Sequence, residues 1–213
     1  MKKIIILFLM LSSILIKAQY EITAGMGLNF VNSPSFTDYV NVNFALQSDR
    51  LSSMNSAVEF YGEFSYDLSP SFGLGLDYSN LIFSFNTISH VGTYDVNYLH
   101  YKPSLVVYYQ IPGEGYKFKF GAGLGPRFVS LDEKLPYFSN SLNYSTTGIG
   151  FLLRAEGNTL LSGDMYANIN FDLRYDLPGE PDGDKKLTNR VLNETVNVNS
   201  VSFAIKLGIS YKL

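Results

Sequence analysis

The stretch that most constrains the fold of this chain is VSFAIKLGISYKL, residues 201–213. Large apolar side chains alternate there with small or polar ones, which is the signature of a β-strand with two unlike faces. The apolar row consists of Val201, Phe203, Ile205, Leu207, Ile209, Tyr211 and Leu213. A face this apolar must be covered, and either a protein core or lipid can cover it.

The same alternation recurs in seven further segments. They are 20–30, 57–68, 72–80, 94–110, 116–130, 144–156 and 165–177. We predict a strand for each, and we expect the third to continue to residue 85 across a break in register near Asn80. Most of these segments exceed the usual strand length of about five or six residues. Thirteen residues at about 3.3 Å each, tilted by about 40°, span roughly 33 Å, which is enough to cross an apolar layer of about 25 Å.

The connections between the predicted strands alternate in length. They are 31–55, 69–71, 86–93, 111–115, 130–143, 157–164 and 178–196. The odd-numbered connections are mostly long and the even-numbered ones are mostly short. A soluble sandwich gives no reason for this asymmetry, whereas an outer-membrane barrel has short periplasmic turns and longer extracellular loops. The sequence therefore predicts an all-β fold, an eight-stranded antiparallel up-and-down transmembrane β-barrel.

The N-terminal segment has a different pattern from the rest. Two lysines precede an apolar run over 4–16, and cleavage is expected near Ala18 or Gln19. This predicts a cleaved secretory signal peptide over 1–19, followed by one barrel domain over 20–213. A transmembrane anchor is the alternative, but the run is several residues too short for one. The chain has no cysteine, so the exported domain is not held by disulfides.

The charge balance excludes one class of partner. Without the three lysines of the predicted signal peptide, 13 of the 16 basic residues remain against 19 acidic ones, a net charge of −6. Binding to nucleic acid needs a basic surface, so we expect no nucleic-acid partner. Beyond residue 18 no apolar run approaches the length of a membrane helix, so any membrane role must use strands.

The second face of the predicted strands carries eight acids and eight bases, and we expect no charge on the face with the large apolar residues. Thirteen of the sixteen form the charge network that we predict inside the barrel: Glu59, Glu63, Asp67, Asp77, Lys102, Lys117, Lys119, Arg127, Arg154, Glu156, Asp172, Arg174 and Lys206. The other three are Glu21, Asp176 and Lys212. Because an unpaired buried charge is costly, this balance predicts a closed interior without a wide pore.

Two orientations are compatible with such strands. In a soluble barrel of the lipocalin kind the apolar face would point inward and the charges would be solvated. The apolar face is crowded with Phe and Tyr, which the interior of eight strands cannot hold, and small residues such as Gly25 and Gly27 lie on the polar face. We therefore predict that the apolar face contacts lipid, with tyrosines such as Tyr20 and Tyr211 at the membrane interfaces. The terminal strand then pairs with the first, because an open edge cannot lie in a bilayer.

Several stretches carry a family resemblance. They are KAQ at 17–19, ITAGMGLNF at 22–30, EFYGEFSYDLSPSFGLGLDYS at 59–79, GAGLGPRF at 121–128 and the terminal strand. Through them the chain resembles the small eight-stranded outer-membrane barrels of the OmpA/OmpX/OmpW-like group, and among these the porin-family proteins of Bacteroidetes-type bacteria. The final aromatic residue usual in these proteins is Leu213 here. The resemblance implies an outer-membrane location, contact with outer-membrane lipid and the barrel-assembly machinery, and we expect a monomer.

Residues that carry chemistry are few. Some eight-stranded barrels are lipid-modifying enzymes, and a lipid A deacylase of this size uses a His-x-Ser pair with an acid. The two histidines, His90 and His100, lack a serine two residues on, so we expect no enzyme and no catalytic residue. Glu180, Asp182 and Asp184 offer oxygen ligands, but their spacing fits no established calcium loop. We expect a solvated turn there, with no metal site and no cofactor.

The first long connection holds a helical pattern. Ser35 is a candidate helix cap, and several of the residues after it are spaced as on one face of a helix. These residues are Phe36, Tyr39, Val40, Asn43 and Phe44. A short amphipathic helix at the barrel rim is predicted. It either packs on its own barrel as a lid, which we favour, or presents a surface to a partner or ligand.

The sequence indicates architecture more firmly than activity. The leading expectation is a structural or surface-interaction role in the outer membrane, with loops that carry the specific contact and no ligand that the sequence identifies. One alternative is transport of a small hydrophobic molecule, against which the charged interior argues. A second is lipid modification, against which the missing His-x-Ser pair argues.

Overall fold

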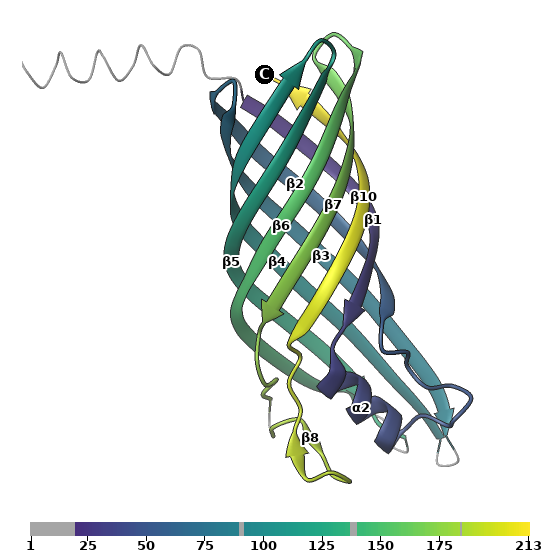
Figure 1. Ribbon diagram of the computed structural model, residues 1–213. Helices are drawn as coiled ribbons and strands as arrows, with labels where there is room; N and C mark the ends of the chain where they lie inside the picture. The colour runs from purple at the N-terminus through teal and green to yellow at the C-terminus, as the bar shows by residue number, and fades with distance from the viewer. Residues whose placement is uncertain (1–19, 90–91, 137–139, 184) are drawn as a thin grey trace, which may run out of the picture.

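The computed structural model describes residues 20–89, 92–136, 140–183 and 185–213, and the predicted signal peptide lies outside the described residues. Its main element is a closed barrel of antiparallel strands (Figure 1). The strands are β1 (Tyr20–Asn32), β2 (Asn55–Ser69), β3 (Phe72–Ser89), β4 (Gly92–Gly113), β5 (Tyr116–Lys134), β6 (Leu142–Ser162), β7 (Met165–Leu177) and β10 (Ser200–Lys212). Around the ring each long strand lies beside its neighbours in sequence. The predicted eight-stranded up-and-down barrel is confirmed.

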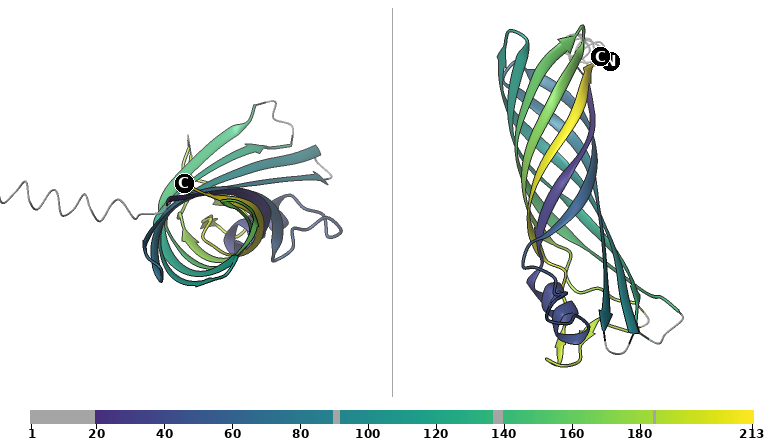
Figure 2. Two further views of the ribbon diagram at one scale, coloured as in Figure 1. Left: turned by 90° about the horizontal axis from the view of Figure 1, so that it is seen from above. Right: turned by 90° about the vertical axis from the view of Figure 1, so that its right-hand side faces the viewer.

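The ring closes at β1, which pairs along its length with both β2 and β10. Leu28, for example, lies opposite Val58 of β2 and Ile205 of β10. The predicted pairing of the first and last strands is therefore confirmed. Seen along the barrel, the strands form a ring, and the helix α2 (Pro34–Asn43) lies within its outline (Figure 2).

The two faces of each strand have opposite surroundings. On β10 the residues Ser202, Ala204 and Lys206 are buried inside the barrel. The alternating apolar row points outward, with exposed fractions from 38% for Phe203 to 65% for Leu213. The alternative that placed this apolar row inside a soluble barrel is therefore wrong.

β3 runs without the register break predicted near Asn80. Its pairing with β4 is continuous over its whole length, and the irregularity in its pairing with β2 lies instead between Asp67 and Ser69. The sequence pattern misleads because Leu81 and Phe83 point inward, toward an apolar cluster. Near the loop end the barrel interior is apolar, so apolar residues of β3 lie on the inward face there. The apolar pattern therefore shifts by one residue although the strand has no bulge.

The two ends of the barrel differ in the length of their connections. Residues 70–71, 114–115 and 163–164 make short turns at one end, where the C-terminus also lies (Figure 1); we call it the turn end. The longest connections, 33–54 and 178–199, lie at the opposite end, which we call the loop end. The predicted alternation of short turns and long loops is confirmed.

Several connections are shorter than predicted, among them 130–143, because β5 continues to Lys134 and β6 begins at Leu142. β3 and β4 pair up to Ser89 opposite Gly92, so most of the predicted connection 86–93 belongs to the strands. Likewise, β6 continues to Ser162 and takes in most of the predicted connection 157–164. Neither extension shows a strict apolar alternation, but backbone pairing continues without it.

The outward face carries charge near the loop end, where none was expected. Asp95 of β4 lies opposite Lys134 of β5 on this face. Neither side chain is buried. The outward apolar belt therefore ends before the strands do, and the strands project beyond it.

The pairing of β4 with β5 is interrupted where both strands carry a proline. The ladder stops over residues 102–104 of β4 and 125–127 of β5, and proline has no N–H to donate to it. The Nη1 of Arg127 donates hydrogen bonds to the carbonyl oxygens of Pro103 (2.9 Å) and Pro126 (2.9 Å). This side chain thus provides hydrogen-bond donors to backbone carbonyls at the interruption.

The first long connection contains α2, whose start differs by two residues from the prediction. Ser33 is its N-cap residue, in place of Ser35, because Pro34 is favoured in the first helical turn, where its missing N–H costs nothing. The Oγ of Ser35 instead accepts a hydrogen bond from the backbone N–H of Asn197 (3.1 Å). In the part of the chain that the structure describes, no helix is long and apolar enough to cross a membrane.

The last long connection forms a small hairpin of β8 (Thr188–Asn189) and β9 (Glu194–Thr195). It is tied to the barrel through Asp182, which exchanges two backbone hydrogen bonds of 2.8 and 2.9 Å with Ser145 of β6. The segment that was predicted to be a solvated turn therefore also pairs with β6 through its backbone.

Candidate functional site

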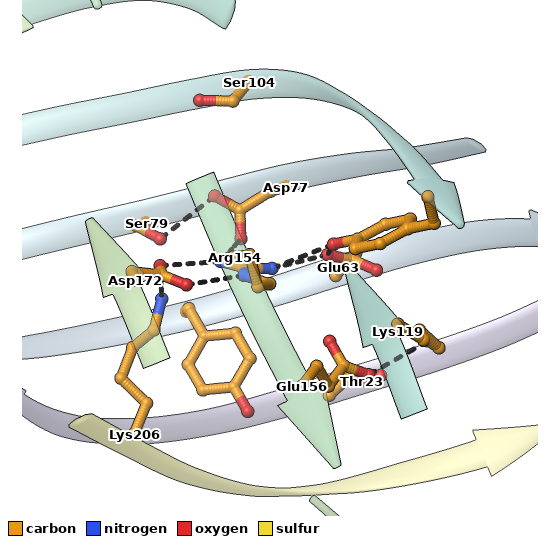
Figure 3. A network of polar contacts seen from close by, with 12 residues as sticks. Thr23, Glu63, Asp77, Ser79, Ser104, Lys119, Arg154, Glu156, Asp172 and Lys206 are labelled. Atoms are coloured by element: carbon orange, nitrogen blue, oxygen red, sulfur yellow. Dashed lines mark hydrogen bonds and ion pairs between the residues drawn. The ribbon is translucent and has the colours of Figure 1, made fainter. Parts of the chain in front are cut away.

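The barrel interior holds a cluster of buried ion pairs centred on Arg154 of β6 (Figure 3). Its guanidinium donates to Asp172 through Nε (2.7 Å) and Nη2 (2.9 Å). Nη1 donates to Glu63 (2.6 Å), and Nη2 donates also to Asp77 (2.8 Å). These acids come from β7, β2 and β3, so one side chain links strands from opposite sides of the ring.

The cluster continues through acids that each accept from more than one base. Asp172 also accepts from Arg174 (3.0 Å) and Lys206 (2.5 Å). Lys206 in turn reaches Glu59 (3.2 Å), which also pairs with Lys102 (2.6 Å). All five side chains are buried. Shared partners of this kind make the group a coupled set in which no single pair acts alone.

A second group of ion pairs lies nearer the turn end. Glu21 of β1 accepts from both Lys117 (2.7 Å) and Lys119 (2.6 Å) of β5. Lys119 also pairs with Glu156 (3.0 Å), and Lys117 with Asp67 (3.4 Å), whose side chain is 17% exposed. Here again one acid joins strands that are not neighbours in the ring.

Nearer the loop end, Arg127 pairs with Asp176. Both side chains are buried. A side chain at Gly150 would collide with both partners, so the lack of a side chain there makes room for this ion pair.

All thirteen residues of the charge network lie inside the barrel or, for Asp67, partly exposed at its rim. Two residues that the sequence placed on the same face but outside the network, Glu21 and Asp176, pair with its members. The third, Lys212, does not join; its Nζ lies 5.0 Å from the ring centre of Tyr166.

Two interior tyrosines were missed by the sequence reading. Tyr108 donates from its hydroxyl to Glu63 (2.5 Å), and Tyr61 donates to Asn168 (2.7 Å) and lies under the Nζ of Lys206 (4.5 Å to the ring centre). Both tyrosines lie in the row of alternating residues that points inward on their strands, and this position in the sequence could have identified them as interior residues. The sequence prediction of the interior network included only the charged residues of that face, so the two tyrosines were left out.

The interior supplies little that resembles a catalytic or metal site. His100 is buried with its Nδ1 3.4 Å from the hydroxyl of Tyr98, and Ser104, four residues further along β4, donates to the carbonyl oxygen of Lys102 (3.5 Å). Within the described ranges no group of three potential metal ligands occurs. His90 and Asp184 lie outside the described residues.

At the loop end the interior is apolar. Residues of α2 and the rest of the first long connection, of the last long connection and of the inward strand faces form one buried cluster, which we call the cap. Its members are Phe36, Tyr39, Val40, Leu51, Ala57, Leu81, Tyr94, Val96, Tyr98, Val129, Leu131, Leu187, Val196 and Val198. The favoured prediction that the helix packs on its own barrel is confirmed, because the buried apolar residues of α2 belong to this cluster.

One polar group fixes α2 to the barrel wall. Glu133 accepts hydrogen bonds at Oε1 from the hydroxyls of Tyr39 (2.6 Å) and Tyr94 (2.9 Å). Burial, reinforced by the charge of Glu133, raises the pKa of Tyr39 well above its usual range. The hydroxyl of Tyr39, which is protonated at neutral pH as in any tyrosine, donates to Glu133 and links the helix to β5.

Comparison with known proteins finds similarity in structure alone. No family model matches the sequence, and no curated protein matches it. A major outer membrane protein from Thermus thermophilus superposes with a TM-score of 0.59 at 14% identity, over 92% of this chain and 99% of that one. Ail, the attachment invasion locus protein of Yersinia pestis, gives 0.57 at 12% identity, over 92% and 99%.

Neisserial surface protein A gives a TM-score of 0.54 at 11% identity, over 91% of this chain and 97% of that one. A second structure of Ail, in complex with the heparin analogue sucrose octasulfate, also gives 0.54, at 12% identity over 92% and 99%. At these identities the likeness establishes the fold. It is the fold of the small outer-membrane β-barrels.

Proposed function

We propose that the chain is an outer-membrane protein whose closed barrel anchors a surface built by its long connections. The outward apolar belt supports the lipid contact, because its large side chains are exposed and the belt itself carries no charge. An arginine or lysine placed in such a belt at mid-membrane costs about 2–4 kcal/mol. Insertion as a monomer by the barrel-assembly machinery, after removal of residues 1–19, belongs to the same proposal.

Aromatic rings at both edges of the belt support this placement. Outward tyrosines near the turn end are Tyr20, Tyr66, Tyr109, Tyr116 and Tyr211. Those on the loop side are Tyr78, Tyr101 and Tyr175. Tyrosine favours the membrane–water interface because its ring is apolar and its hydroxyl is polar. Beyond the loop-side tyrosines the outward face becomes charged, as expected outside a bilayer.

The observation that carries the closed barrel is the ion-pair cluster around Arg154. Its side chains come from across the ring and meet in the middle, which leaves no continuous wide path through them. Eight strands enclose an interior that side chains fill. We infer that the charge network stabilises the barrel and blocks conduction, so the barrel serves as a support.

The surface role rests on what lies at the loop end and on the neighbours. Ail is named for attachment and Neisserial surface protein A for its surface position. In this chain the loop end combines a helix, a hairpin and strands that project beyond the belt. We assign the specific interaction to these elements.

The two alternatives fit the geometry less well. Passage of a hydrophobic molecule through the barrel would cross a layer of buried ion pairs, at a large desolvation cost. Lipid modification of the His-x-Ser kind needs a serine hydroxyl within reach of a histidine, whereas the described His100 meets the hydroxyl of Tyr98 and Ser104 donates to the carbonyl oxygen of Lys102. We therefore propose a protein that is not an enzyme.

Planar-bilayer recording of the purified, refolded protein tests this function. We expect no stable single-channel currents, with a large general porin as the positive control. The barrel itself is checked by gel mobility, because a closed barrel resists unfolding by detergent and migrates differently when the sample is not boiled. Stable, large currents from a sample that passes this check would refute the closed-support function and favour transport.

A further inference from the structure

A cavity of about 700 Å³ opens beside the cap at the loop end. It lies between the end of α2, the outer ends of β5 and β6, and the segment before the β8–β9 hairpin. Its described lining includes the aromatic residues Tyr39, Phe44 and Tyr144 and the charged residues Glu133, Lys185, Lys186 and Arg190. Sites for small organic ligands usually measure about 300–1,000 Å³, so this cavity has the right size for one.

The charges around the cavity are mainly positive. Lys185, Lys186 and Arg190 come from one short segment and are exposed. Lys186 has an acid partner, Glu180 at 3.2 Å, but that pair is 63% and 46% exposed and therefore weak. The lining thus offers three cations that an anion can recruit.

Among the described residues of the lining, the one acid is already engaged. Glu133 is buried, and its Oε1 accepts hydrogen bonds from the hydroxyls of Tyr39 and Tyr94. These bonds tie one of its oxygens to the cap, while Arg190 lies close enough to interact with its charge. Among the described lining residues three exposed cations therefore outnumber this single acid.

Aromatic rings form a fixed wall of the cavity. Phe44 stacks on Tyr94 with ring centres 4.0 Å apart and planes 7° from parallel. It meets Tyr39 edge-on at 5.4 Å. Because these rings are already held by one another, a flat or ring-shaped ligand can pack there without ordering them first.

We propose that this cavity binds a small organic anion in which a carboxylate is attached to a ring. The ring packs against Phe44 and Tyr39. The carboxylate pairs with Arg190, whose planar guanidinium matches a carboxylate in a two-point contact, and with Lys185. The proposal rests on the surface-interaction function and deepens it by naming a ligand class for the loop end.

Two sources share this chemistry, an aromatic acid and an acidic sugar. Isothermal titration of the refolded full barrel in detergent micelles distinguishes them, with phenylacetate and glucuronate as probes. Phenylacetamide and glucose serve as matched neutral controls. We expect at least one acid to bind with a dissociation constant of about 1 mM or tighter, and at least tenfold more tightly than its neutral control. Binding of phenylacetate alone assigns the aromatic source, and binding of glucuronate alone assigns the sugar.

Variants locate the binding. Arg190→Ala is expected to weaken the acid at least tenfold, Arg190→Lys is expected to recover part of the affinity, and Arg50→Ala is the control, an exposed arginine that does not line the cavity. Equal binding of acids and neutral controls, no binding by either acid, or equal loss in Arg50→Ala would each overturn the proposal. A failure of the binding test would not change the result of the conduction test. A barrel that conducts ions and still binds the acid would refute the closed-support function but not the binding site.

Discussion

The interior of this barrel is filled in two different ways along the same strands. On β4 the inward residues are Lys102 and Ser104 in the middle of the barrel, but Tyr94, Val96 and Tyr98 near the loop end. The charge network fills the first region with shared ion pairs. The cap fills the second with apolar packing against a helix supplied by the first long connection.

The contrast teaches how each region should respond to damage. In the charge network single side chains serve several partners, as Arg154 serves three acids, so removal of one such side chain leaves several buried charges short of a partner. In the cap each side chain contributes mainly packing, and α2 comes from a connection outside the strand ladder. The network should therefore unfold with the barrel, while the cap should open locally.

The largest effect is expected from Arg154→Met. It leaves Glu63, Asp77 and Asp172 short of a base, and loss of one partner from a buried ion pair typically costs about 3–5 kcal/mol. The free energy of unfolding, measured by urea titration in lipid vesicles, should fall by this amount, and by less in Arg154→Lys. Arg50→Met is the matched control on an exposed arginine. Equal stability of Arg154→Met and the control would show that the network does not hold the barrel.

A charge in the outward belt should cost slightly less. Leu105 of β4 is 59% exposed on the belt, and Leu105→Arg should reduce the free energy of unfolding by about 2–4 kcal/mol in vesicles. Thr93→Arg, on the same face of the same strand but beyond the belt, should have little effect. If both variants assembled and unfolded alike, the assignment of the belt to lipid would be wrong.

A smaller effect is expected where β4 and β5 each carry a proline. Arg127→Lys keeps a charge beside Asp176 but loses the planar donors that reach the carbonyls of Pro103 and Pro126. Leaving a buried carbonyl unsatisfied costs about 1–3 kcal/mol. Urea titration should show this loss, together with faster amide exchange on both sides of the interruption. Unchanged exchange there would show that Arg127 serves only its ion pair.

The smallest effect on global unfolding is expected from the cap. Leu187→Ala removes a fully buried apolar side chain, a change that costs about 2–5 kcal/mol where the packing is lost. This cost should appear as faster proteolysis within 33–54, with a midpoint of barrel unfolding close to that of the unmodified protein. A shift in midpoint as large as that of Arg154→Met would mean that cap and network are one cooperative unit.

The barrel could be predicted from the sequence because alternation with a period of two is typical of strands. The apolar or polar character of each strand face then indicates whether that face contacts lipid or the barrel interior. The sequence could not predict which charges pair, because stagger sets this: Glu59 meets Lys102 and Lys206, from strands far away in the sequence. It also misplaced a bulge in β3 and missed Tyr61 and Tyr108. Those errors share a cause, since alternation was read as though one kind of residue filled the whole interior.

Planar-bilayer recording of a variant without α2, in which residues 34–53 are replaced by a short Gly-Ser linker, tests the central claim most directly. The claim is that the charge network closes the barrel without help from the cap. We predict that the unmodified protein and the linker variant both lack stable single-channel currents, provided each passes the gel-mobility check. A steady current in the linker variant would contradict the claim and would show that the cap, and not the charge network, blocks conduction.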